Sequence, residues 1–205
     1  MQINIDKKTG ILGTIIVVLL GVIITMSVSS KNEDGFFGMG HSRMMDSDRT
    51  NGVDDLTGAD IMFLQMMIPH HQQAVDISKL ALTKSKDAEL LALATAIRDG
   101  QADEIVQMKQ WLASAGASVD MGHSMGDSMG GMLDDQELAN LKSATGVNFD
   151  RLWLAGMTGH HDGALHMVHM IEDAENPTIK KFGQDILSLQ TAQIEQMKLM
   201  LQRIG

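Results

Sequence analysis

The side chains of this sequence with the clearest chemical potential are methionines and histidines that recur together. In two places methionine stands three or four residues before a pair of adjacent histidines, and further histidine and methionine follow the second pair. Residues three and four apart share one face of an α-helix, so thioether and imidazole groups at these spacings approach one ion together. We therefore interpret ten residues as candidate metal ligands: Met66, Met67, His70, His71, Met157, His160, His161, His166, His169 and Met170.

The ligand types indicate which metal such a site would take. Thioether and imidazole suit Cu(I), whereas Mg²⁺, Ca²⁺ and Mn²⁺ prefer oxygen donors. Structural zinc sites usually recruit cysteine, and this chain of 205 residues has 18 methionines, 8 histidines and no cysteine. Copper, as Cu(I), is the predicted cofactor, with silver as its mimic and zinc less favoured.

Two segments rich in glycine and serine carry a second set of these side chains. A Met-Gly-His-Ser sequence occurs in each, before each of the two histidine pairs. Drift in low-complexity sequence could produce it, and the functional alternative is a set of mobile ligands that capture an ion. These auxiliary candidates are Met39, His41, Met44, Met121, His123 and Met125.

Apolar residues recurring at three and four predict the helices that would position these ligands. The expected ranges are 57–82, 86–115, 134–144, 148–174 and 177–204, the last with Pro177 at its start. Residues 31–56 and 116–133 lack this period and are predicted linkers. The folded domain is expected to span residues 57–205, as hairpins 57–115 and 134–205.

The two hairpins are repeats of one another. Asp60, Met67, His70, His71 and Ala74 recur 90 residues later, and residues 101–112 of the second helix match residues 190–201. Two amphipathic hairpins with similar faces cannot each bury that face alone. We therefore predict an all-α fold, a four-helix bundle with pseudo-two-fold symmetry.

An apolar stretch from Ile11 to Val28 precedes the first linker. Lys7 and Lys8 stand before it, so residues 1–30 are interpreted as an N-terminal transmembrane helix with a cytoplasmic N-terminus. A signal peptide cleaved near Ser29 is the alternative. Both interpretations place the rest of the chain outside the cytoplasm, at the cell membrane or in a secreted or periplasmic form.

The formal net charge is −10, with no cluster of lysine or arginine, which argues against a nucleic-acid partner. Glu-x-x-His pairs, which a di-iron carboxylate bundle requires, are absent from the sequence. Nucleophile-elbow, phosphate-loop and HExxH motifs are absent too. No enzymatic activity is therefore predicted.

The segment Phe63-Leu64-Gln65-Met66-Met67-Ile68-Pro69-His70-His71-Gln72-Gln73-Ala74, the helix Gln101 to Leu112 and their second copies resemble the domain-of-unknown-function 305 family. That family includes periplasmic copper-binding proteins of the CopM type. The resemblance covers residues 57–204 and implies a ferritin-like bundle that binds copper or silver outside the cytoplasm in metal tolerance. By position, it implies ligands at Met67, His70, His71, Met157, His160 and His161.

The function expected from these observations is that of an extracytoplasmic copper buffer or chaperone, anchored to the membrane, with a metal-receiving partner that remains unknown. One alternative is a helical sensor or adaptor whose histidines respond to pH. A less favoured alternative is an oxidoreductase that uses copper or iron.

Overall fold

The computed structural model describes residues 55–121 and 130–205. Within these ranges the chain is helical and contains no strand, as predicted. The helices are α2 (Gly58–Lys84), α3 (Ala88–Ser114), α4 (Asp135–Ser143), α5 (Gly146–Val168), the 3₁₀ turn η2 (His169–Ile171) and α6 (Pro177–Ile204). Residues 11–28, the predicted membrane segment, lie outside the described ranges, and no helix inside them is long and apolar enough to cross a membrane.

Polar residues at the N-termini explain where the helices begin. The Thr57 hydroxyl accepts from the backbone N–H of Asp60, whose carboxylate accepts from the Thr57 backbone, which is a capping box. Asp134 and Glu137 form the same arrangement at α4, and Asn176 caps α6 ahead of Pro177. These side chains satisfy backbone donors that a helix start leaves free.

The end of α5 differs from the prediction. Its apolar period continues to Ala174, but the α-helix ends at Val168 and gives way to a single 3₁₀ turn. The tighter turn buries Ile171 against the core and sends the chain back toward Pro177. Periodicity alone does not distinguish a final 3₁₀ turn from an α-helical one.

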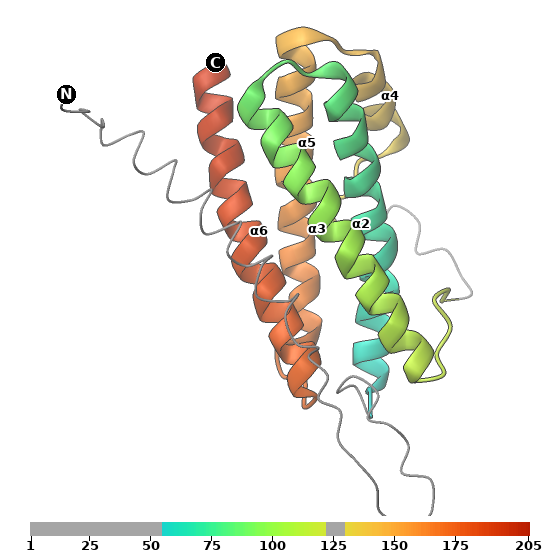
Figure 1. The fold of residues 1–205 in the computed structure, drawn as a ribbon. Coiled ribbons are helices and arrows are strands. Elements are labelled where there is room, and N and C mark those ends of the chain that lie inside the picture. The colour runs from blue at the N-terminus through green and yellow to red at the C-terminus, as the bar shows by residue number, and fades with distance from the viewer. Residues whose placement is uncertain (1–54, 122–129) are drawn as a thin grey trace, which may run out of the picture. The chain divides into compact units, whose positions relative to one another are not determined.

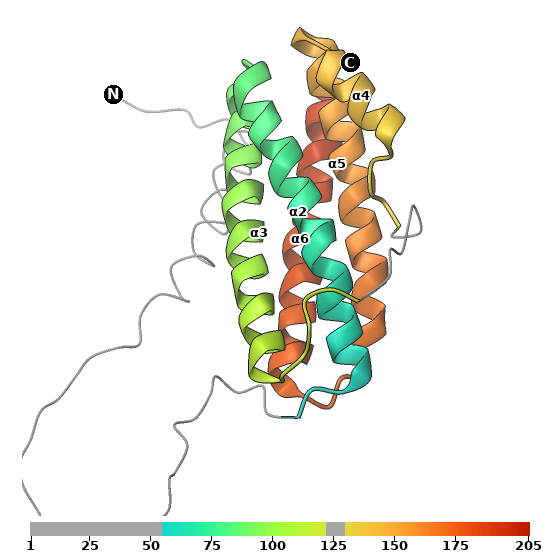
Figure 2. The same ribbon diagram turned by 90° about the vertical axis from the view of Figure 1, so that its right-hand side faces the viewer.

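The helices form two antiparallel hairpins, α2 with α3 and α5 with α6, that lie side by side (Figures 1 and 2). Between the hairpins, the indole N–H of Trp153 in α5 donates to the backbone carbonyl of Ile77 in α2 at 3.1 Å. Trp111 in α3 and Phe182 in α6 meet edge to face with ring centroids 5.0 Å apart. The predicted four-helix bundle is confirmed, and α4 packs on α5 as a fifth helix.

Two apolar clusters fill the two ends of the bundle, and each draws on both hairpins. The Phe63 cluster includes Phe63, Leu64, Met67, Met108, Trp111, Leu112, Met167, Ile171, Ile179, Phe182 and Ile186. The Trp153 cluster includes Ile77, Ala81, Leu90, Leu93, Ile97, Phe149, Trp153, Leu154, Met157, Met197 and Met200. Burial of apolar area of this kind dominates the stability of a small domain.

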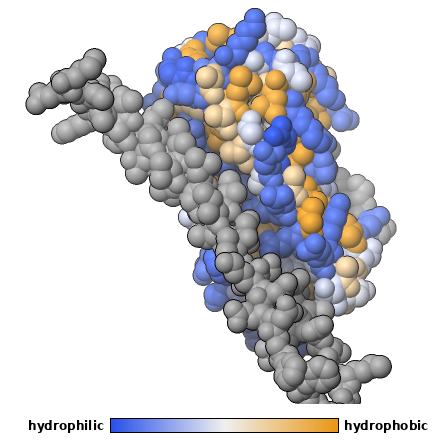
Figure 3. Space-filling model, in the orientation of Figure 1, coloured by the Kyte–Doolittle hydropathy of each residue, from blue (hydrophilic) through white to orange (hydrophobic). Residues whose placement is uncertain are grey.

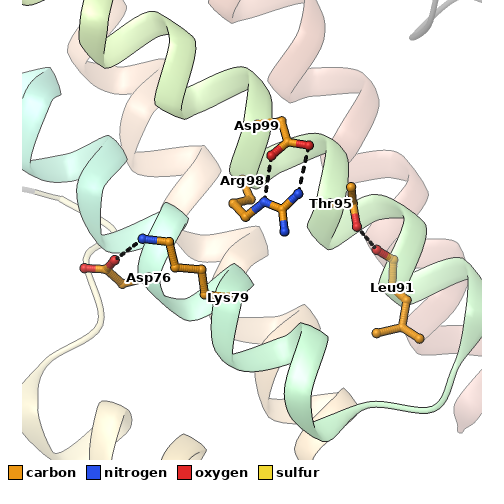
Figure 4. Close-up of polar contacts among 6 residues, drawn as sticks. All are labelled: Asp76, Lys79, Leu91, Thr95, Arg98 and Asp99. Carbon is orange, nitrogen blue, oxygen red and sulfur yellow. Dashed lines mark hydrogen bonds and ion pairs between the residues drawn. The ribbon is translucent and has the colours of Figure 1, made fainter.

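The outer surface is conventional for such a bundle. Lys79 pairs with Asp76 on α2, and Arg98 with Asp99 on α3, where Thr95 also donates its hydroxyl to the carbonyl of Leu91 (Figure 4). Both polar and apolar residues occupy the face shown in Figure 3. Exposed pairs of this kind contribute little to stability, so the interior decides the fold.

Candidate metal centre

A layer of polar side chains crosses the bundle between the two apolar clusters. Each long helix contributes two of its members, and every member has a repeat-related counterpart in the other hairpin. The polar layer consists of His70, His71, Gln101, Glu104, His160, His161, Gln190 and Gln193. Polar groups at this depth require either partners or a ligand.

All four histidines of the layer are fully buried. The helical period would allow one member of each adjacent pair to face the interior and the other to lie near the edge, but the structure buries both. Because α2 has α3 on one side and α5 on another, His71 faces α3 while His70 faces α5. The same holds for His161 and His160 in α5.

His70 and His160 stack on each other across the hairpin interface. Their ring centroids are 3.7 Å apart and the ring planes make an angle of 37°. Rings at this separation leave no room for a metal ion between them, because each metal–nitrogen bond is itself about 2 Å long. The stack joins the two hairpins at the level of the polar layer.

The second histidine of each pair, His71 or His161 (here called the outer histidine because it faces the second helix of its own hairpin), is held by that helix. His71 Nε2 lies 2.7 Å from a Glu104 carboxylate oxygen, and His161 Nε2 lies 2.7 Å from the Gln193 side-chain oxygen. Glu104 and Gln193 are 89 residues apart and occupy equivalent positions of the repeat. The two halves thus share one geometry, with a carboxylate in the first and an amide in the second.

A short segment, Gly130 to Leu133, packs against both α2 and α5 beside the histidines. The Gly130 carbonyl lies 3.3 Å from His70 Nε2. Gln73 holds the segment from α2, accepting from the backbone N–H of Leu133 at 2.8 Å and donating to its carbonyl at 2.9 Å. On α5, Gly163 lies directly beneath, where a Cβ would overlap the Gly130 carbonyl.

Five imidazole nitrogens of the polar layer have no hydrogen-bond partner among the described residues. They are His70 Nδ1, His71 Nδ1, His161 Nδ1 and both ring nitrogens of His160. The side-chain oxygens of Gln101 and Gln190 share this condition. Each polar group that is buried without a partner costs about 1–3 kcal/mol. Five such nitrogens in one layer therefore favour a binding site in which a ligand supplies the missing partners.

His70, His160 and His161 are held in the neutral form that metals bind. Burial, and secondarily the neighbouring His71, lowers the pKa of His70 from 6.5 to about 3. Burial likewise lowers the pKa of His161 to about 4, against the opposing effect of its bond to Gln193. Burial also lowers the pKa of His160 well below its ordinary value. Neutral imidazole is the ligating form, so metal need not displace protons from these rings at neutral pH.

The donors present fit a soft monovalent ion better than a hard one. Met67 and Met157 are fully buried one helical turn before the two histidine pairs. Within residues 55–121 and 130–205, no group of three or more His, Cys, Asp or Glu side chains is arranged to hold one ion. The interior supplies imidazole nitrogens from the polar layer and thioether sulfurs from Met67 and Met157, which pack in the Phe63 and Trp153 clusters.

The remaining predicted ligands of α5 lie elsewhere. The side chains of His166 and His169 are 74% and 64% exposed, and each hydrogen-bonds locally, His166 to the Asp162 carbonyl and His169 to Glu172. These two candidate ligands therefore do not share the buried face of the histidine pairs. His166 comes five residues after His161, a rotation of about 140° on an α-helix, which turns it to the outer face.

The methionines among the candidates divide similarly. Met66 is buried in the Phe63 cluster, against which Met121 and Met170 pack while half-buried. Met39, His41, Met44, His123 and Met125 lie outside the described residues, so the proposed auxiliary site stays a prediction.

Glu104, Gln193 and the Gly130 carbonyl are site residues that sequence reasoning missed. The internal repeat does align Glu104 with Gln193. A carboxylate at one position and an amide at the other argue against a di-iron centre. The alignment alone therefore gives no reason to assign either residue to a metal site. The signal that identifies both is their place three residues after Gln101 and Gln190, on the face that meets the histidine helix.

Comparisons with known proteins are consistent with this architecture. Among solved structures, a DUF305 protein from Streptomyces coelicolor, described as secreted, is similar at 29% identity and a TM-score of 0.68. The match covers 72% of this chain and 94% of that protein. CopM in a Cu(II)-bound form is 35% identical with a TM-score of 0.63, and in a Cu(I)-bound form 34% identical with a TM-score of 0.60. These cover 71% and 70% of this chain, and 97% and 96% of their own. No curated protein matches in sequence.

The model of one family, Domain of unknown function (DUF305), matches residues 60–201, which include both hairpins and the whole polar layer. The resemblance stated from the repeated His-His motifs is therefore confirmed. This chain belongs to the DUF305 family.

Proposed function

We propose that this protein is a non-enzymatic, extracytoplasmic copper-binding protein that takes Cu(I), and Ag(I) as its mimic, and acts as a buffer or chaperone in metal tolerance. The observation that carries the proposal is the polar layer, in which five buried imidazole nitrogens lack partners. Imidazoles, with a buried methionine one helical turn before each histidine pair, form a donor set suited to a soft cation.

The comparisons support the same proposal. CopM has been crystallised with Cu(I), with Cu(II) and with silver. These matches cover 70–71% of this chain and 96–97% of CopM, at 32–35% identity. The similarity of the Streptomyces coelicolor protein, described as secreted, supports a place outside the cytoplasm. Anchoring through residues 1–30 belongs to the proposal and rests on the sequence alone.

The polar layer gives less support to the two alternatives. A pH sensor needs histidines that titrate near neutrality, whereas the pKa values of His70 and His161 lie at about 3 and about 4. Di-iron chemistry takes glutamates from several helices, whereas Glu104 is the one carboxylate that contacts a buried histidine in the described part of the chain.

Titration of the purified protein with Cu(I), against a competing chelator, tests the proposal. The variant for comparison replaces His70, His71, His160 and His161 by leucine, which removes the ring nitrogens while retaining apolar volume. We expect the wild type to compete for Cu(I) and the fourfold variant to lose this binding. Thermal unfolding without metal establishes that the variant is folded.

A second variant, with His166 and His169 both replaced by alanine, is the matched control. It removes two histidines from the outer face of the same helix. We expect it to retain the competition for Cu(I) seen in the wild type. A wild type that binds Cu(I) no more tightly than the fourfold variant would overturn the proposal.

A further inference from the structure

The partners of the outer histidines determine which ring nitrogen carries the proton. A carboxylate accepts hydrogen bonds and does not donate them, so the 2.7 Å contact of Glu104 with His71 requires a proton on Nε2. The Gln193 amide presents its oxygen to His161, which places a proton on Nε2 there as well. A neutral imidazole carries a single N–H, so a neutral ring with that proton on Nε2 has its lone pair on Nδ1.

The surroundings of Nδ1 agree with this assignment. In both His71 and His161 that atom is buried and has no hydrogen-bond partner within the described ranges. A lone pair without a donor is the condition of a nitrogen that is ready to bind a metal. The second ring nitrogen is meanwhile engaged, as is usual for histidines that ligate metals.

The two halves differ in charge although they share their geometry. Glu104 places a carboxylate against His71, with its side chain 20% exposed, whereas Gln193 places a neutral, buried amide against His161. A carboxylate behind a ligating imidazole makes the ring a stronger donor and offsets the charge of the bound cation. An amide orients the ring without either effect.

We infer that Glu104 and Gln193 are positioning residues that select Nδ1 as the ligating atom of His71 and His161, and that Glu104 makes the His71 half bind the soft cation more tightly. This inference rests on the proposed function, because it concerns the same buried histidines. Beyond the proposed function, the inference names the ligating atom and the residues that select it. It also states that the His71 half binds the cation before the His161 half.

Nitrogen-15 NMR of the histidine side chains tests the selection of the ligating atom. In the metal-free full chain we expect Nδ1 of His71 and His161 to show the shift of an unprotonated nitrogen, and Nε2 that of a protonated one. Added Ag(I), which is diamagnetic, should then perturb Nδ1. A protonated Nδ1 in the metal-free protein, or a response to Ag(I) at Nε2, would overturn the assignment.

Exchange of the two partners tests the difference in affinity. Glu104→Gln retains an acceptor and removes the charge, so we expect Nε2 to stay protonated while Ag(I) affinity falls by about 10- to 100-fold, the usual effect of altering a ligand's hydrogen-bond partner. Gln193→Glu is the reciprocal change and should tighten binding in the His161 half. Glu104→Leu removes the acceptor, and with it the preference for the Nε2-protonated ring of His71.

The outcomes separate this inference from the proposed function. Wild-type protein that binds Ag(I), with both exchange variants binding it equally well, would overturn the role of Glu104 and leave the proposed function intact. Wild-type protein that binds neither Ag(I) nor Cu(I) would overturn the proposed function, while the protonation of the metal-free rings would still be measured. A structural role alone would change the melting temperature of the Glu104→Gln variant without changing its affinity.

Discussion

At the scale of single residues, the four buried histidines are the costly feature of this molecule. Imidazole in an apolar interior loses the hydrogen bonds it makes with water, and here five ring nitrogens find no replacement among the described residues. An interior of leucine would avoid that cost. Burial without full hydrogen bonding is understandable where the free nitrogens serve a ligand that arrives after folding.

The lowered pKa values predict how stability depends on pH in the absence of metal. The unfolded chain binds protons at histidine near pH 6.5, whereas folded His70 and His161 bind them only near pH 3 and pH 4. Between these limits the unfolded state holds more protons, so the free energy of unfolding should fall as the pH drops below 6.5. Each such histidine contributes about 1.4 kcal/mol per pH unit at most.

Urea unfolding at pH 7, 6 and 5, with a chelator present, measures this dependence. In a His70→Leu variant the slope should decrease by the share of one histidine. An unchanged slope in that variant would contradict the assignment of the lowered pKa to His70.

At the scale of elements, the segment Gly130 to Leu133 controls how closely the connection between the hairpins approaches the site. Its backbone lies against α5 at Gly163, where only a residue without a side chain leaves space. Gln73, the repeat counterpart of Gly163, holds the same segment from the opposite helix. Equivalent positions of the two repeats therefore serve the same segment in different ways. Gln73 hydrogen-bonds to it, and Gly163 leaves space for its backbone.

Replacing Gly163 by alanine should destabilise the protein, although alanine favours helix. The added Cβ overlaps backbone atoms of Gly130, which cannot move away as a flexible side chain would. We expect a loss of about 1–3 kcal/mol, the usual cost of overpacking. Chemical denaturation measures it.

Gly100→Ala, inside α3, is the matched control, because nothing lies within 4 Å of its added Cβ. That change should stabilise the protein by about 0.5–1 kcal/mol. Similar effects of the two changes would mean that Gly130 does not pack on α5 as described.

At the scale of the whole bundle, the two hairpins depend on each other for their core. Trp153 of the second hairpin bonds to the backbone of Ile77 in the first, and Phe182 packs on Trp111. Arg203 near the end of α6 pairs with Asp87 and Glu89 at the start of α3. The polar layer itself exists only where the hairpins meet, because His70 stacks on His160.

A peptide of residues 55–121, the first hairpin alone, should therefore fail to fold as a monomer. Its apolar face would be exposed, and the two clusters that cover it need the second hairpin. Circular dichroism and size-exclusion chromatography measure this, with residues 48–205 as the folded control. A monomeric hairpin that melts cooperatively would show that the repeats are independent.

Much of the fold could be predicted from the sequence because its determinants are local. The periods of α2, α3 and α6, the capping residues Thr57, Asp134 and Asn176, and the duplication of the His-His motif all act within a few residues of themselves. The helical period determines which residues share one face of a helix. It therefore identifies His70, His71, His160 and His161 as one set from the sequence.

Only the tertiary structure decided what those faces meet. It buried both histidines of each pair and brought Glu104, Gln193 and the Gly130 carbonyl to particular ring nitrogens. The physical reason is that the choice of neighbour depends on how helices far apart in the chain pack together, and a period of 3.6 residues carries no information about that packing.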